Sequence, residues 1–144
     1  MSRRATPYRL VPPVVREASI QRTVAGVLRL DVAREGHVSP QGVCWFSIDM
    51  AHFAGVPGTR VARGICAGVP DIIVLYRGAA HWIELKTKAK DSALSDDQQE
   101  MCAALLLAGC RYGVARDENE VLACMDAWQI PRRHRVKLAR EVAA

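Results

Sequence analysis

Three residues in the middle of the chain have the types and the spacing of a hydrolytic site: Asp71, Glu84 and Lys86. Asp71 begins an apolar run that predicts a strand, and Glu84 and Lys86 lie near the end of a second run that returns after a short turn. Because side chains alternate along a strand, Glu84 and Lys86 should share one face. The start of one hairpin strand lies opposite the end of the other, so the three groups should converge at one sheet edge.

Converging carboxylates repel each other, which raises their pKa values and disfavours the ionised forms. A divalent cation removes that penalty, and carboxylate oxygens with a backbone carbonyl nearby are the ligands that Mg²⁺ and Mn²⁺ prefer. A lysine beside such a cation can orient or help deprotonate a water, or neutralise charge on a phosphorane-like transition state. The three residues therefore suit phosphodiester hydrolysis. Taken alone, an Asp and a Glu-x-Lys more often form a solvent-exposed ladder of charged residues. The surrounding sequence must therefore distinguish a hydrolytic site from such a surface.

The hydrophobic periodicity predicts the elements that would carry this hairpin. Apolar residues recur at helical spacing in the first part of the chain, and Ser95 with Gln98 gives a capping box for a helix that ends near Gly109. Runs of β-branched and aromatic residues predict the strands. A mixed sheet flanked by helices, in one α/β domain, follows from this order. The expected helices are 15–34, a short one near 60–66, 95–108 and 117–128, and the expected strands are 43–48, 71–76, 80–86 and 111–115.

Composition and charge agree with one folded domain. A chain of 144 residues that is 50% hydrophobic can bury a core and is not disordered as a whole. We expect an extended N-terminal arm at 1–14, the folded domain at 15–130 and a basic C-terminal helix or tail at 131–144. The net charge of +5 is concentrated in the two ends, while the centre is acidic. This suits a polyanion-binding protein that collects cations at its centre, although solvated tails would give the same pattern.

The cysteines and the apolar runs narrow the class of protein. Five cysteines, with no Cys-x-x-Cys pair, argue against a disulfide framework and against a zinc ribbon. The longest apolar run is about half the length of a bilayer-spanning helix, and prolines interrupt the N-terminal region where a signal peptide would be apolar. We therefore expect a cytoplasmic protein with no membrane association.

The segments GVPDIIV (68–74) and WIELKT (82–87) resemble the core of the PD-(D/E)XK, or restriction-endonuclease-like, nuclease superfamily. Within it, the chain is most similar to the VRR-NUC family, whose Leu-Ser-x-x-Gln signature is present as LSDDQ (94–98). The family's first-helix Glu, four residues before a Gln, matches Glu17 and Gln21. The resemblance covers roughly residues 16–128, and it implies a single restriction-endonuclease-like domain.

The resemblance also implies a role for each matching residue. Asp71 and Glu84 would bind Mg²⁺ or Mn²⁺, with the backbone carbonyl of Leu85 as a third ligand. Lys86 would be the catalytic lysine. Glu17 would complete the catalytic site or bind a second metal.

Two glutamines would support this site. Gln21 lies one helical turn after Glu17, on the same face. Gln98 matches the glutamine of the family's helix after the lysine, although a plain helix-capping role is a close alternative.

The activity that the resemblance implies is a metal-dependent nuclease, a hydrolase acting on DNA phosphodiester bonds. Branched or flapped duplex would be the substrate of a structure-specific endonuclease of this kind, and small members of the family suggest a homodimer. Four basic residues near the site could hold phosphates, although each alone is more often a solvated surface residue. They are Arg60, Arg63, Lys88 and Lys90.

Two departures from the family pattern bear on substrate preference. The segment 88–93 is longer than the family's turn and lacks its glycine, and 47–50 replaces an asparagine-glycine turn. Two alternatives to an independent nuclease remain at this point. One is a catalytically silent nucleic-acid-binding module with a nuclease fold, which the presence of Asp71, Glu84 and Lys86 disfavours. The other is a restriction-type subunit that cuts only with a partner.

Overall fold

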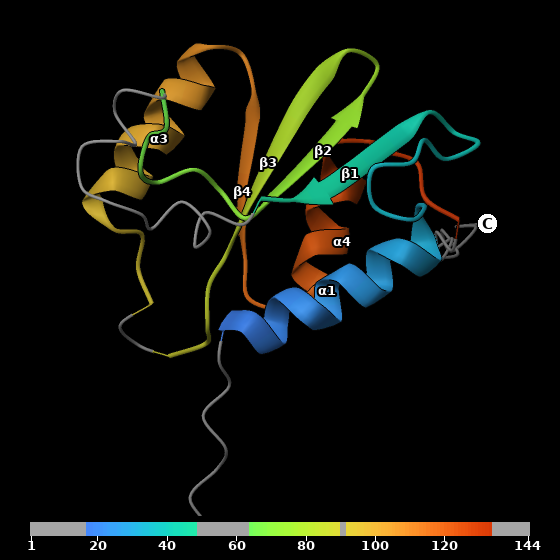
Figure 1. The fold of residues 1–144 in the computed structure, drawn as a ribbon, viewed down its shortest axis with the longest axis horizontal. Coiled ribbons are helices and arrows are strands. Elements are labelled where there is room, and N and C mark those ends of the chain that lie inside the picture. Colours follow the sequence, from blue (N-terminus) through green and yellow to red (C-terminus); the bar gives the residue numbers. More distant parts are fainter. Residues whose placement is uncertain (1–16, 49–63, 90–91, 134–144) are drawn as a thin grey trace, which may run out of the picture.

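The computed structural model describes residues 17–48, 64–89 and 92–133 of the chain (Figure 1). Every expected strand is present in these residues, with ends that differ by at most one residue from the prediction. The three long helices are present too and are slightly shorter than expected. The elements are α1 (Glu17–Asp31), β1 (Val43–Ser47), β2 (Ile72–Tyr76), β3 (Ala79–Leu85), α3 (Asp96–Leu107), β4 (Arg111–Ala115) and α4 (Glu118–Ala127).

Some expectations fall outside the described residues. The arm at 1–14 and the segment 134–144 of the basic tail lie outside them. Of the short helix expected near 60–66, only residues 64–66 are described, and these are not helical. The limits of the proposed domain at 15–130 therefore stay a prediction.

The four strands form one mixed sheet in the order β1-β2-β3-β4. β1 pairs with β2, and β2 with β3, in antiparallel orientation, whereas β3 and β4 are parallel. The connection from β3 to the parallel strand β4 runs through α3, as a parallel pair requires. The mixed α/β architecture predicted from the sequence is confirmed.

The β2–β3 hairpin sets the register that positions the polar residues. Arg77 and Gly78 both have positive φ, at 49° and 76°, which is the backbone of a two-residue hairpin turn. This turn pairs Ile72 with Ile83. Asp71, one residue before β2, therefore lies across from Glu84.

Helices cover the two faces of the sheet unequally. α1 and α4 lie together on one face, where their apolar side chains join Ile72, Ile83 and Leu85 in the hydrophobic core (Figure 1). α3 lies on the other face, the side of Glu84, and none of its residues is buried. No helix in the described ranges is long and apolar enough to cross a membrane.

Arg132 joins the end of α1 to α4. Its Nη1 donates to Asp31 Oδ2 at 2.9 Å, and its Nε and Nη2 donate to the two carboxylate oxygens of Asp126 at 3.1 and 2.9 Å. The Arg132 side chain is only 9% exposed. The first arginine of the expected basic tail is thus part of the packed structure.

Arg132→Ala should lower the free energy of unfolding by about 2 kcal/mol, because it removes the charged hydrogen bonds from Arg132 to two carboxylates. This is below the usual cost of breaking a fully buried pair, since the Asp126 side chain is 36% exposed. Urea denaturation measures the loss. Arg29→Ala is the control: Arg29 makes the same kind of two-bond contact with Glu35, but at 50% exposure, and should change little. Equal losses of unfolding free energy in the two variants would contradict a stabilising role for the buried Arg132 contacts.

Candidate active site

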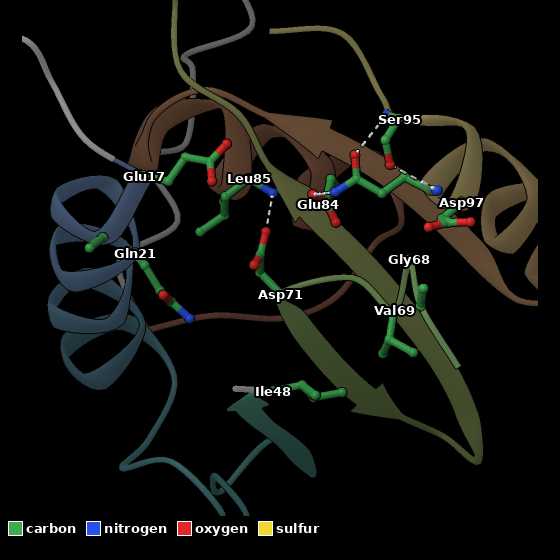
Figure 2. Close-up of a pocket in the computed structure, with 13 residues that line it drawn as sticks. Glu17, Gln21, Ile48, Gly68, Val69, Asp71, Glu84, Leu85, Ser95 and Asp97 are labelled. Atoms are coloured by element: carbon green, nitrogen blue, oxygen red, sulfur yellow. Dashed lines mark hydrogen bonds between the residues drawn. The ribbon is translucent and has the colours of Figure 1, made fainter. Parts of the chain in front are cut away.

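A cavity of about 450 Å³ opens at the edge of the sheet where β3 ends and β2 begins (Figure 2). Its wall combines the first turns of α1 and α3 with the loop before β2 and the end of β3. Six residues predicted for the site line it: Glu17, Gln21, Asp71, Glu84, Leu85 and Gln98. The remaining lining residues are Ala18, Ile48, Ala67, Gly68, Val69, Ser95 and Asp97.

Asp71 is held at the start of β2 by two backbone contacts. Its Oδ2 accepts the N–H of Leu85 at 2.8 Å (Figure 2), and its carbonyl oxygen accepts the N–H of Ile48 at 2.7 Å. Partial burial raises the pKa of the Asp71 carboxyl, and the bond from Leu85 opposes that rise. Asp71 is therefore fixed toward the end of β3 by the hairpin itself.

Glu84 is the most buried carboxylate of the cavity, at 3% exposure. Its Oε1 accepts the side-chain amide of Gln98 at 2.5 Å and lies 3.4 Å from Nζ of Lys86. Its Oε2 is buried and has no hydrogen-bond partner among the described residues. Burial, followed by the nearby charge of Asp71, raises the pKa of Glu84 to about 7.

Lys86 follows β3 and lies between two acidic side chains. Its backbone N–H donates to the carbonyl of Ala115 at 2.9 Å, which continues the parallel pairing beyond the strand. Its Nζ lies 3.4 Å from Glu84 and 3.9 Å from Oε1 of Glu17. The Lys86 side chain is 11% exposed, whereas that of Glu17, in the first turn of α1, is 61% exposed. Lys86 is therefore a nearly buried cation with one exposed and one buried acidic neighbour.

Gln98 both caps α3 and contacts Glu84. The Ser95 hydroxyl accepts the N–H of Gln98 at 3.3 Å, and Oε1 of Gln98 accepts the N–H of Ser95 at 3.0 Å, which is a complete capping box. Because Oε1 is used by the cap, the amide nitrogen faces Glu84. The two roles that the sequence left as alternatives are both present in one side chain.

The residues present fit a hard divalent cation. The orphaned Oε2 of Glu84 and the neighbouring Asp71 offer carboxylate oxygens, and Leu85 lies in the same wall. In the described ranges, no three His, Cys, Asp or Glu side chains lie close enough to hold a metal ion by themselves. The carboxylates of Asp71 and Glu84 are thus the anionic donors that the described cavity wall offers to a cation.

Of the four basic residues expected near the site, only Lys88 is among the described residues, and it does not line the cavity. Lys88 is exposed and pairs with Asp117 at 2.7 Å. It lines a separate groove of about 250 Å³ beside α1 and the start of α4. Arg60, Arg63 and Lys90 lie outside the described residues.

Sequence reasoning missed part of the cavity wall. Gly68 belongs to the motif at 68–74, but the motif alone does not predict its contact with α3. The available signal was the residue type, since glycine permits another backbone segment to approach closely. Asp97 lies in the 94–98 signature and Ile48 in the expected strand 43–48, but neither was predicted in the wall, because that place depends on how α3 and β1 meet the hairpin.

The fold matches a solved structure described as a "VRR_NUC domain protein", with a TM-score of 0.60 over 83% of this chain and 93% of that chain. The sequence identity is 20%, so the match establishes the fold. No protein-family model and no curated protein matches the chain. The VRR-NUC-type fold that the sequence motifs predicted is confirmed.

Gln98→Glu should raise the pKa of Glu84 above its value of about 7. The substitution keeps the capping oxygen but removes the amide donor and places a second carboxylate against Glu84, and both changes disfavour the ionised form. An NMR titration of the Glu84 carboxyl carbon in metal-free protein measures the shift.

Gln99→Glu is the matched control, because Gln99 is exposed and its amide donates to the carbonyl of Leu94. It adds the same charge one residue along the helix, away from Glu84. Equal shifts in the two variants would show that the Gln98–Glu84 contact is absent in solution.

Proposed function

We propose that this protein is a Mg²⁺- or Mn²⁺-dependent nuclease that hydrolyses DNA phosphodiester bonds. The observation that carries the proposal is the buried Glu84 carboxylate, which lies beside Asp71 and Lys86 and has one oxygen without a hydrogen-bond partner in the described part of the chain. A buried carboxylate of this kind is costly unless a cation offsets it. The likeness in fold to a VRR_NUC domain protein supports the nuclease assignment.

Each predicted site residue has a part in this proposal, including Lys86, which does not line the cavity itself but lies beside Glu84. Asp71 and Glu84 hold the cation together with the carbonyl of Leu85, and the cation supplies positive charge for activating water and polarising the phosphate. The contact from Leu85 N–H keeps Asp71 oriented, and Gln98 keeps Glu84 oriented. Lys86 Nζ lies 3.4 Å from Glu84 Oε1, where it orients the attacking water or neutralises the developing charge. Glu17, exposed and 3.9 Å from Lys86, completes the site from α1.

The substrate and assembly belong to the same proposal. Basic ends around an acidic centre suit DNA, and Arg60, Arg63, Lys88 and Lys90 are proposed phosphate contacts. A branched or flapped duplex and a homodimer, which would present two sites to two strands, follow by analogy with the VRR-NUC family. A cytoplasmic location stays a prediction.

Asp71→Asn should abolish cleavage and weaken Mn²⁺ binding, because it removes the charge while leaving an oxygen for the N–H of Leu85. Calorimetry measures Mn²⁺ binding. Cleavage is followed on linear, flapped and four-way DNA with Mg²⁺, Mn²⁺ or chelator. Asp96→Asn, at an exposed position in the first turn of α3, is the control and should retain both properties. Undiminished cutting by the wild-type protein in excess chelator would refute the proposal.

Lys86→Met should lower the single-turnover rate by roughly 10²–10⁴-fold, the usual range for one acid–base or electrostatic group. Methionine keeps an apolar stem in a position that is 8% exposed. Affinity for DNA should fall by less than about tenfold, since one contact among many is removed. Lys86→Arg should not restore the rate, because its planar guanidinium is bulkier than the compact ammonium group of lysine.

Lys88→Ala is the control, because Lys88 carries the same charge but lies in a separate groove. It separates an effect on the cleavage rate from an effect on DNA affinity. It should weaken DNA binding modestly and keep the rate at saturation. If Lys86→Met loses affinity and turnover equally, Lys86 is a phosphate anchor and its proposed role is wrong. Wild-type protein that binds DNA without cutting it would instead identify a silent binding module.

A further inference from the structure

We infer that Gly68 is a positioning residue of this site. By allowing the first turn of α3 to lie directly against the loop before β2, it lets the Gln98 amide reach Glu84. The inference rests on the proposed function only where cleavage is the readout, since the contact itself can be measured without activity. Gly68 touches neither the proposed cation nor DNA in this account, and it acts through Gln98.

The space beside Gly68 admits no side chain. A Cβ built on Gly68 would overlap the carbonyl oxygen of Asp97 and would lie 2.5 Å from the carbonyl carbon of Asp97 and 2.9 Å from the backbone nitrogen of Gln98. These are backbone atoms of the first turn of α3, so no rotamer change can relieve the overlap. Gly68 also has φ of +80°, a backbone conformation that favours glycine. Any other residue would push α3 away from the loop.

α3 packs against β4 through residues that are only partly buried. None of its residues is buried, and Leu106 and Leu107 near its end are 53% and 91% exposed. Its first turn, by contrast, makes the capping box with Ser95 and the contact from Gln98 to Glu84. A displacement at Gly68 would therefore move the helix before it disturbed the core.

The same loop positions Asp71. Pro70 is fully buried, and the carbonyl of Asp71 accepts the N–H of Ile48, so the loop is anchored three residues after Gly68. Gly68 thus links the element that carries Asp71 to the helix that supports Glu84. The spacing of the two carboxylates and their supporting groups depends on this backbone contact.

The effect should resemble the loss of a supporting group behind a metal ligand, which typically costs about 10–100-fold in affinity or activity. Gly68→Ala is the test variant and Gly42→Ala is its matched control. Gly42 has nearly the same φ, +81°, but nothing lies within 4 Å of its Cβ position. It precedes β1 at the end remote from Ile48 and the cavity. Gly42→Ala therefore has nearly the same unfavourable φ as Gly68→Ala but no overlap of its Cβ with other atoms.

The first readout is the NMR signal of the Gln98 side-chain amide in metal-free protein, alongside the thermal melt. Gly68→Ala should shift this signal toward that of a solvent-exposed glutamine, while Gly42→Ala leaves it unchanged. Both variants should melt cooperatively. An unchanged Gln98 signal in Gly68→Ala, or loss of its cooperative melt, would overturn the proposal, because Gly68 would then have no effect on α3 or only a general folding role.

The second readout is the single-turnover rate in a double-mutant cycle with Gln98→Ala. Gly68→Ala should slow cleavage by about 10–100-fold with little change in DNA affinity, and Gly42→Ala by less than about threefold. In the Gln98→Ala background, Gly68→Ala should add little, since both changes remove the same contact. Fully multiplicative losses would overturn the proposal. If the wild-type protein does not cleave DNA, the proposed function fails while the Gln98 signal still decides the role of Gly68.

Discussion

The buried carboxylate of Glu84 is the constraint on which the rest of this structure depends. A carboxylate at 3% exposure needs hydrogen bonds or a nearby cation, and among the described residues Gln98 and Lys86 contact only its Oε1. Burial of the carboxylate, followed by the nearby charge of Asp71, raises the pKa of Glu84 to about 7. The described protein groups therefore leave one buried carboxylate oxygen of Glu84 without a hydrogen bond. A cation bound at this oxygen would offset the cost of burying the charge.

The architecture follows from the need to bring this group next to Asp71. Alternation along β3 sends Ile83 and Leu85 into the core and leaves Glu84 on the opposite face, under the first turn of α3. The Arg77-Gly78 turn then fixes the hairpin register that sets Asp71 opposite Glu84. One face of the sheet forms the hydrophobic core, and one end of the other face carries the proposed active site.

The parts of this arrangement that could be predicted from the sequence are local ones. Strand alternation, the hairpin turn and the Ser95–Gln98 capping box each depend on residues close in the chain, and all three are present. The remainder depends on distant segments. The seat of α3 against Gly68 and the pairing of Arg132 with Asp31 join residues far apart in sequence, and no spacing pattern encodes them.

The capping box explains why a local signal can also carry function. Glutamate at the third helical position would cap Ser95 as well as glutamine does, but it would set a like charge against Glu84. Glutamine alone offers an oxygen to the cap and a donor to the carboxylate. No residue of α3 is buried, so the Gln98 side chain and the backbone contact at Gly68 determine where the helix lies relative to the site. Substitutions toward the exposed end of α3 should therefore matter less to the site than a single methyl group at Gly68.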